Sequence, residues 1–211
     1  IIGTLDYGGA EKQLLKLCAH LDRERFDPVV IALRKNGPFL PLFRSAGIRV
    51  VEAGKRWKID PVFFPGLVSL IARCRPHIVH TFMFTANTWG RLAARIAGVR
   101  ILVASERCVD PWKRWHHKLI DRILTKMTAV VVPNSEPVRK FYEHQIGIPA
   151  AKMVVIPNGI ETNIPVRSRE DVRREFGFDG DAPVVACAGR FTRQKGFRYL
   201  MAAVPRIASH V

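Results

Sequence analysis

Short apolar segments alternate with helical segments along most of the chain, and this alternation limits the possible folds more than any other feature. The strand-like segments are 28–33, 48–51, 77–80, 100–104, 129–132 and 152–156, and residues 1–2 resemble the end of another strand that begins outside the sequence. Helical spacing of apolar residues occupies 10–21, 39–46, 62–74, 86–97, 112–127 and 135–144. Continuous apolar strands separated by helices are typical of a parallel sheet covered on both faces. We therefore predict an α/β fold, a doubly wound Rossmann-like domain with about seven parallel strands.

The last fifty residues have a different character. Residues 161–183 carry many charges and few strand formers, apart from a helical stretch over 169–176, and we interpret them as a linker. Residues 184–188 predict one strand and 195–207 one helix. One strand and one helix bury too little surface to form a core. We therefore expect a first domain over 1–160, a linker over 161–183 and a second Rossmann-like domain, truncated, over 184–211.

The charge balance favours anionic partners. The 211 residues include 34 Lys and Arg against 18 Asp and Glu, a formal net charge of +16. Such a balance suits nucleic acid, phosphorylated substrates or an acidic membrane surface. Four scattered cysteines without a CxxC pair suit a reducing cytoplasm, and no apolar run reaches the length of a membrane span. We expect a cytoplasmic protein without a metal or another cofactor.

The sheet topology predicts where ligands bind. In a doubly wound sheet they lie outside the carboxyl ends of the strands. Gly8 and Gly9 follow the first strand there and open a helix, so we expect a tight glycine turn whose backbone N–H groups face an anion. A turn with nothing bound fits the same pattern. His80 ends another strand, where a cleft role and a satisfied buried histidine are both compatible with the sequence.

Two cations lie on a predicted strand-to-helix loop in the second domain. Arg190 and Lys195 flank the start of the helix predicted over 195–207. Arginine can bind a diphosphate with two hydrogen bonds and lysine can act as a point charge. Stabilising a departing diphosphate in this way would be electrostatic catalysis. A solvated basic loop is the alternative.

Four groups of residues along the chain match, in their order and spacing, the motifs of one known protein family. In chain order they are Gly8-Gly9-Ala10-Glu11; His80 with Asn87 and Gly90-Arg91-Leu92-Ala93; Asn134-Ser135-Glu136-Pro137-Val138 with Val155-Ile156-Pro157-Asn158-Gly159-Ile160; and Gly189-Arg190 with Gln194-Lys195-Gly196. Their order and spacing resemble the retaining glycosyltransferases of family 4, which have the GT-B fold. The resemblance implies two Rossmann-like domains, of which the first binds the acceptor and the second the nucleotide-sugar donor.

The resemblance also implies residue roles. Arg190 and Lys195 would hold the donor's diphosphate and replace a metal in catalysis, and Gly8 and Gly9 would close on the donor from the opposite wall. His80, Asn87 and Arg107 would lie on the acceptor side, where we also expect Trp57, because it lies on a predicted cleft-edge loop. Many family members carry a histidine after the fifth strand, where this sequence has Arg107, and we expect that arginine to contact phosphate instead. The family's paired glutamates lie beyond Val211, so we expect residues 1–211 to be inactive alone.

Two clusters mix aromatic and basic residues, at 55–58 and 112–118. We expect the helix over 112–127 to turn its apolar residues inward and its basic residues outward. The inward set is Trp112, Trp115, Leu119, Ile123 and Leu124, and the outward set is Lys113, Arg114, Lys118 and Arg122. Such a basic face can lie on anionic lipid. We predict that one side of the cleft mouth is formed by Lys55, Arg56, Trp57, Lys58, Lys113 and Arg114, which would place the protein peripherally on the inner membrane face. Charges that only keep the protein soluble are the alternative.

These features lead to one functional hypothesis and two alternatives. The hypothesis is a transferase that moves a sugar, with retention, from a nucleotide-diphosphate sugar to an acceptor hydroxyl. The acceptor would be lipid-linked or an envelope glycan, which implies cell-envelope glycan synthesis. A basic nucleic-acid-binding module is one alternative, although no helix-turn-helix, RNP or zinc-finger signature supports a nucleic-acid partner. A non-catalytic relative that only binds a nucleotide sugar is the other.

Overall fold

The computed structural model describes residues 1–57, 60, 62–160, 162, 167–178, 180, 182–189 and 191–209, without the side chain of Gln194. The chain divides into two compact units, Ile1–Ile160 and Glu161–Val211, which we describe separately. The predicted linker over 161–183 stays a prediction.

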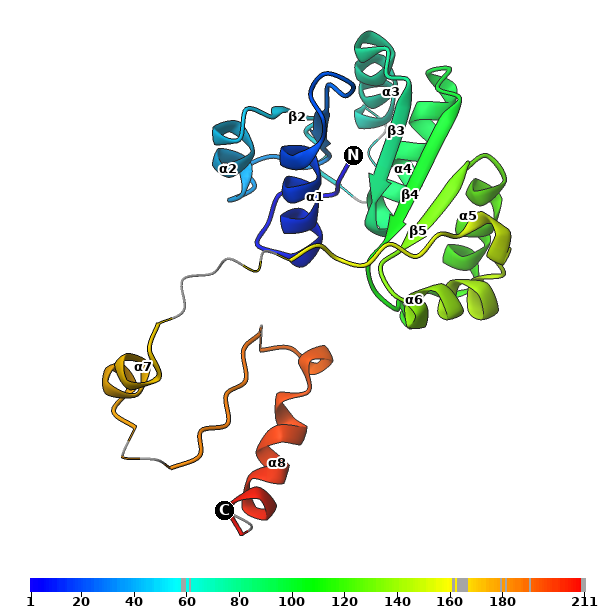
Figure 1. Ribbon diagram of the computed structural model, residues 1–211. Coiled ribbons are helices and arrows are strands. Elements are labelled where there is room, and N and C mark those ends of the chain that lie inside the picture. Colours follow the sequence, from blue (N-terminus) through cyan, green and yellow to red (C-terminus); the bar gives the residue numbers. More distant parts are fainter. Residues whose placement is uncertain are drawn as a thin grey trace. The chain divides into compact units, whose positions relative to one another are not determined.

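The first unit is built on a parallel sheet (Figure 1). β1 (Val29–Ala32) pairs with β2 (Arg49–Glu52), and β3 (Ile78–Phe82) pairs with β4 (Ile101–Glu106), which pairs with β5 (Val130–Pro133). Ile2 joins the two groups because it bridges both Ala32 of β1 and Phe82 of β3. The prediction of a parallel α/β fold is therefore confirmed.

Two of the predicted strands are each reduced to one residue that forms isolated bridges. At one, Ile2 lies between β1 and β3; at the other, Met153 bridges Val131 at the sheet edge. The edge segment still donates two hydrogen bonds to β5, from Val154 N to Val131 O and from Ile156 N to Pro133 O. The segment therefore pairs with β5 along the sheet edge without forming a regular strand.

Helices cover both faces of the sheet. They are α1 (Gly9–His20), α2 (Leu40–Ser45), α3 (Phe63–Cys74), α4 (Met83–Ile96), α5 (Trp115–Lys126) and α6 (Glu136–Phe141), with the π-helical turn η1 (Tyr142–Ile146) and the 3-10 turn η2 (Ala150–Lys152). Alternate residues of a strand point to opposite faces. Accordingly, Val30 and Ala32 pack in the cluster that includes α1 and α2, while Ile31 packs in the cluster that includes α3 and α4.

The orientation predicted for the helix over 112–127, of which the structure forms α5, is wrong for four of its five inward residues, and only Leu124 is buried as expected. Trp115 is 75% exposed, and Trp112, Leu119 and Ile123 are exposed as well. The buried residues of α5 are Asp121, Leu124 and Thr125. The reason is that the inner side of α5 faces buried charged side chains, which require polar partners rather than apolar ones.

The second unit contains α7 (Arg169–Phe176), the 3-10 turn η3 (Arg193–Lys195) and α8 (Phe197–Ala208). The helix predicted over 169–176 is confirmed. The strand predicted over 184–188 is wrong, because the structure gives those residues no strand assignment and leaves all of them exposed. A strand needs a neighbouring strand to bond its backbone, and none of the described residues of this unit supplies one.

Candidate functional site

Three strands and one crossing segment meet at the carboxyl edge of the sheet in the first unit. Phe82 of β3 pairs with Ser105 of β4, and Glu106 of β4 pairs with Pro133 of β5, so the three strands end side by side. The segment after Met153 then crosses this edge toward the start of α1 (Figure 1). There Gly159 exchanges two hydrogen bonds with Gln13, at 2.8 and 2.9 Å.

Arg107 lies at the centre of this edge, directly after β4. Its Nη1 donates to Asn158 Oδ1 at 2.9 Å, and its guanidinium lies 5.3 Å from the centre of the Phe82 ring. Asn134 Nδ2 donates to the Arg107 carbonyl at 3.2 Å and so fixes the backbone. The Nε of Arg107 is buried and has no hydrogen-bond partner within the described part of the chain. Burial lowers the pKa of Arg107.

His80 lies beneath this edge on β3. Its Nε2 is 2.8 Å from Ser105 Oγ, and its ring is 4.3 Å from the Phe82 ring. Burial, together with the positive charge of Arg107, lowers the pKa of His80 to about 3. The imidazole is therefore neutral near pH 7, which suits a hydrogen-bonded support for the edge better than a proton donor.

Asn87 is completely buried on α4. Its Nδ2 donates to Ser105 O at 3.1 Å and to Glu106 Oε1 at 2.8 Å, so it ties α4 to the end of β4. Its Oδ1 has no hydrogen-bond partner among the residues that the structure describes. The structure thus places Asn87 behind the edge, where its side chain does not reach the surface.

Behind the edge lies a charged cluster that sequence reasoning missed, and we call it the buried network. It consists of Arg91, Glu106, Asp110, Lys113, Asp121 and Tyr142. Lys113 Nζ lies 2.7 Å from Asp121 Oδ2 and 2.7 Å from the Tyr142 hydroxyl, and Arg91 Nη2 lies 3.3 Å from Asp121 Oδ1. Arg91 and Lys113 were the sequence signal for a buried charged cluster. The apolar periodicity of 112–127 instead predicted that Lys113 lies on the outer face of its helix.

Tyr142 explains how this network distributes its protons. Its hydroxyl lies 2.7 Å from Glu106 Oε2 and 3.1 Å from Asp110 Oδ2. A hydroxyl can donate only one hydrogen, so it cannot satisfy two ionised carboxylates. Burial raises the pKa of Glu106 to about 7, which indicates that Glu106 is the carboxyl group that takes up a proton. Burial alone would lower the pKa of Lys113, but the carboxylates of Glu106 and Asp121 raise it overall.

The predicted glycine turn at the start of α1 takes a different form. Gly8 has φ −152° and ψ 162°, an extended conformation open to any residue, and Gly9 is the first residue of the helix. The carboxylate of Glu11 lies so close to Gly8 that any larger residue there would require the Glu11 side chain to move. A carboxylate of the chain itself therefore lies against the backbone where the sequence predicted an anion.

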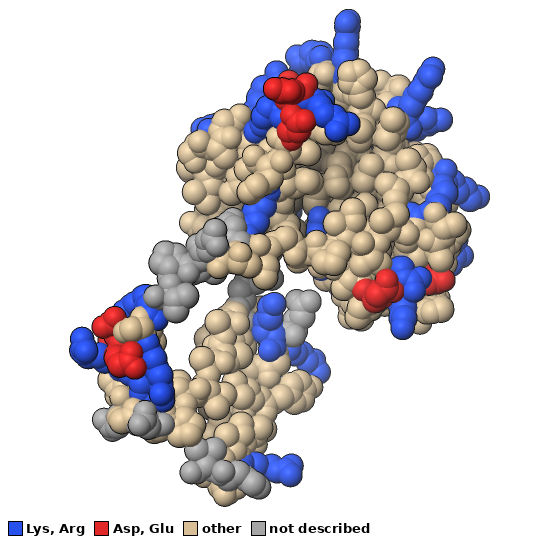
Figure 2. Space-filling view, in the orientation of Figure 1, with Lys and Arg blue, Asp and Glu red and all other residues tan. Residues whose placement is uncertain are grey.

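The predicted basic rim is not formed as expected. Lys55 and Lys113 are buried, at 6% and 4% exposure, so neither is available at a surface. Both are held by polar groups: Lys55 donates to Trp57 O and Lys113 pairs with Asp121. Trp57 is 62% exposed, and Lys58 lies outside the described residues. On the face shown in Figure 2, Lys and Arg are spread over the first unit rather than gathered in one patch.

The second unit holds the predicted diphosphate loop. Arg190 lies outside the described residues, and Lys195 is exposed in η3. Gly196 follows with φ 72°, a conformation that favours glycine, and is the N-cap residue of α8. Phe191 and Phe197, which flank this loop in the sequence, stack their rings on each other with the centroids 4.6 Å apart.

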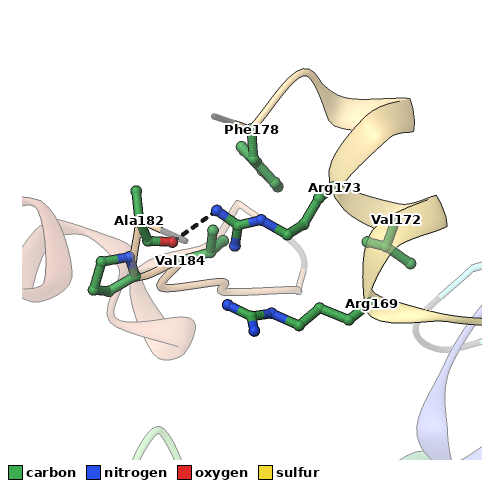
Figure 3. A pocket seen from close by; sticks show the side chains of 7 residues that line it. Arg169, Val172, Arg173, Phe178, Ala182 and Val184 are labelled. Atoms are coloured by element: carbon green, nitrogen blue, oxygen red, sulfur yellow. Dashed lines mark hydrogen bonds between the residues drawn. The ribbon is translucent and has the colours of Figure 1, made fainter. Parts of the chain in front are cut away.

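A hollow of about 370 Å³ also opens in the second unit (Figure 3). It is lined by Arg169, Val172, Arg173, Phe178, Ala182, Pro183 and Val184. The two arginine side chains lie alongside each other in Figure 3, and Arg173 Nη2 donates to Ala182 O at 2.9 Å. None of the site residues predicted from the sequence lines it.

Two kinds of feature are not found in the part of the chain that the structure describes. No group of three or more His, Cys, Asp or Glu side chains there is arranged to hold a metal ion. No helix among those residues combines the length and apolar character needed to cross a bilayer.

Comparisons with known proteins agree with this architecture. Alpha-maltose-1-phosphate synthase from Mycolicibacterium smegmatis is 29% identical over 151 residues, which cover 64% of this chain and 38% of that protein. Among solved structures, a glycosyltransferase from Rickettsia africae superposes with a TM-score of 0.77 and 18% identity, covering 98% of this chain and 56% of that one. HepE from Anabaena, solved in complex with UDP, gives a TM-score of 0.69 and 21% identity, covering 83% of this chain and 48% of that one.

The chain therefore spans 38% of the curated relative and about half of these structures. The structural neighbours support the GT-B type of fold. The sequence model of Glycosyltransferase Family 4 matches residues 7–164. Because this match extends over well more than half of the sequence, the chain belongs to glycosyltransferase family 4.

Proposed function

We propose that the protein transfers a sugar from a nucleotide-diphosphate donor to an acceptor hydroxyl, with retention at the anomeric carbon. The match of the family model over residues 7–164 carries this proposal. The carboxyl edge of β3, β4 and β5 supports it, because open α/β sheets bind their ligands there.

The donor side of the proposal rests on the second unit. Arg190 and Lys195 hold the diphosphate and stabilise its departure, so that no metal is needed, and Gly8 and Gly9 approach the donor from the first domain. Two structures of one neighbour, HepE, support a nucleotide sugar as donor, since it was solved with UDP and with UDP-glucose. Residues 184–188 form no strand here. This agrees with the proposal that residues 1–211 by themselves do not catalyse sugar transfer.

The acceptor side is the carboxyl edge of the first unit, with Arg107 and the exposed Trp57. Asn87 and His80 act there as supports, because both are hydrogen-bonded to the end of β4. Two similar proteins suggest acceptor classes. One is named for the product maltose-1-phosphate, and the other is a lipopolysaccharide outer core galactosyltransferase that superposes with a TM-score of 0.56.

We extend the proposal to cell-envelope glycan synthesis at the cytoplasmic face of the membrane, with a lipid-linked or envelope glycan as acceptor. The net charge of +16 supports attraction to an anionic surface. Since Lys55 and Lys113 are buried, the exposed candidates for that contact are Arg56, Trp57 and Arg114.

The test is a transfer assay on the intact protein with a panel of nucleotide sugars. Lys195→Ala should lower turnover about 100-fold, the scale for loss of one preorganised charge donor. The matched control is Lys140→Ala on α6, an exposed lysine of the first unit, which should leave turnover unchanged. Equal turnover in both variants would remove the proposed diphosphate role. Donor binding without any product would favour the non-catalytic relative.

A further inference from the structure

Arg107 is a partly buried cation that forms no ion pair with the described residues of the chain. Within the described residues, no carboxylate oxygen lies within 4.0 Å of its guanidinium. The buried Arg91, by contrast, is paired with Asp121, and the partly exposed Arg139 with both Glu136 and Glu143. Removing a charge from water without a compensating partner costs free energy. The uncompensated charge of Arg107 therefore needs an explanation.

The groups that touch Arg107 orient it without neutralising it. Asn158 offers a neutral carboxamide oxygen to Nη1, and Phe82 offers the face of its ring. Asn134 holds the backbone carbonyl. The imidazole of His80, whose pKa the charge of Arg107 helps to lower, is neutral. An arginine that neutral partners hold in place keeps an unneutralised positive charge. Such a side chain is suited to bind an anion.

We propose that Arg107 binds a phosphate group carried by a substrate at the carboxyl edge of the sheet. The inference rests on the proposed function, in which both substrates approach this edge. The planar guanidinium fork matches the tetrahedral oxygens of phosphate with two parallel hydrogen bonds, which lysine cannot reproduce. The phosphate can come from two sources: a phosphorylated acceptor, or the diphosphate of the donor.

The experiment is isothermal titration of the 211-residue chain at constant ionic strength, with chloride as the balancing anion. The probes are inorganic phosphate, glucose 1-phosphate and UDP. The variant is Arg107→Gln, and the matched control is Arg100→Gln. Arg100 is exposed and directly precedes β4, whereas Arg107 directly follows it, so both variants remove one positive charge at an end of the same strand.

We expect Arg107→Gln to weaken phosphate binding at least tenfold and Arg100→Gln to change it less than twofold. If Arg107→Gln weakens the binding of inorganic phosphate and glucose 1-phosphate but not of UDP, the site belongs to the acceptor. If it also weakens the binding of UDP, the site belongs to the donor. The proposal is overturned if all three probes bind Arg107→Gln as tightly as the unmodified chain. It is also overturned if the unmodified chain binds none of them.

Thermal unfolding separates binding from a structural role. Phosphate should raise the melting temperature of the unmodified chain and of Arg100→Gln but not of Arg107→Gln. Without phosphate, Arg107→Gln should be at least as stable as the unmodified chain, because it removes an uncompensated charge. If Arg107→Gln does not fold, Arg107→Lys decides: it keeps the charge without the fork and should bind phosphate at least threefold more weakly, and unchanged binding would contradict the proposal.

These results are independent of the transfer assay. Phosphate binding that depends on Arg107, without sugar transfer by the intact protein, would refute the proposed function and keep the anion site. Sugar transfer by the intact protein, together with unaltered phosphate binding in Arg107→Gln, would keep the proposed function and refute the anion site.

Discussion

Helices α3 and α5 have the same length, 12 residues, and both are amphipathic, but they face the inside of the first unit with opposite chemistry. α3 buries Phe63, Leu67 and Ile71. α5 buries Asp121 and Thr125 beside a single apolar residue, Leu124, and leaves Trp115 exposed. The comparison teaches that an apolar stripe faces inward only where the neighbouring elements offer an apolar surface.

The two helices therefore contribute to the fold in different ways. α3 adds hydrophobic burial, which is non-directional. α5 adds directional contacts through Asp121, which holds Lys113 and Arg91 in place, and Lys113 in turn contacts Tyr142. Since Tyr142 contacts Glu106, the residue before Arg107, we infer that the buried network holds the end of β4 in position.

The largest effect is expected at the polar helix. Asp121→Ala removes the partner of two buried cations, and breaking a buried pair in this way costs about 3–5 kcal/mol of unfolding free energy. Denaturant unfolding measures this loss. Glu143→Ala removes a partner of the partly exposed Arg139 and serves as the control, with a much smaller expected change. Comparable losses in the two variants would mean that the network adds no special stability.

A pair of identical substitutions sharpens the comparison between the helices. Leu67→Ala on α3 creates a cavity in the core and should cost about 3 kcal/mol. Leu119→Ala on α5 removes a side chain that is 44% exposed and should change the stability by less than about 0.5 kcal/mol. The measurement is again denaturant unfolding. A large loss at Leu119 together with a small one at Leu67 would show that the orientations of the two helices are reversed.

A smaller effect depends on pH and arises from Glu106. Its folded-state pKa is raised to about 7, above the unfolded value, so the folded chain holds this proton more tightly. Ionisation of Glu106 must therefore lower the stability as the pH rises from about 4.5 to 7. Glu106→Gln mimics the protonated form and does not lose this stability, so its advantage over the unmodified chain should grow by about 2 kcal/mol between pH 5.5 and pH 8.

Thermal unfolding of both proteins across this pH range tests that expectation. Parallel stability curves would show that Glu106 does not carry the proton. Glu24→Gln, at an exposed loop position, supplies the matched change of charge and should shift neither end of the range.

The sequence was sufficient for the parallel α/β fold, because strand and helix periodicities are local signals. It also located the carboxyl edge, where Arg107 and Asn158 do meet. It failed at α5, since the polarity of that helix's inner face depends on Arg91 and Tyr142, which come from other elements. It failed at residues 184–188 because a strand requires a partner that a local pattern cannot supply, and the roles of Lys195 and Arg190 stay predictions.

The central claim is that substrates bind at the carboxyl edge of the first unit. Hydrogen–deuterium exchange of the intact protein, with and without a nucleotide sugar that it uses, tests this most directly. We predict slower exchange in peptides that contain residues 105–109, 133–136 and 156–160 and at the start of α1, and no change on the exposed side of α3. Slower exchange confined to the amino ends of the strands, or to the outer helices, would contradict the account.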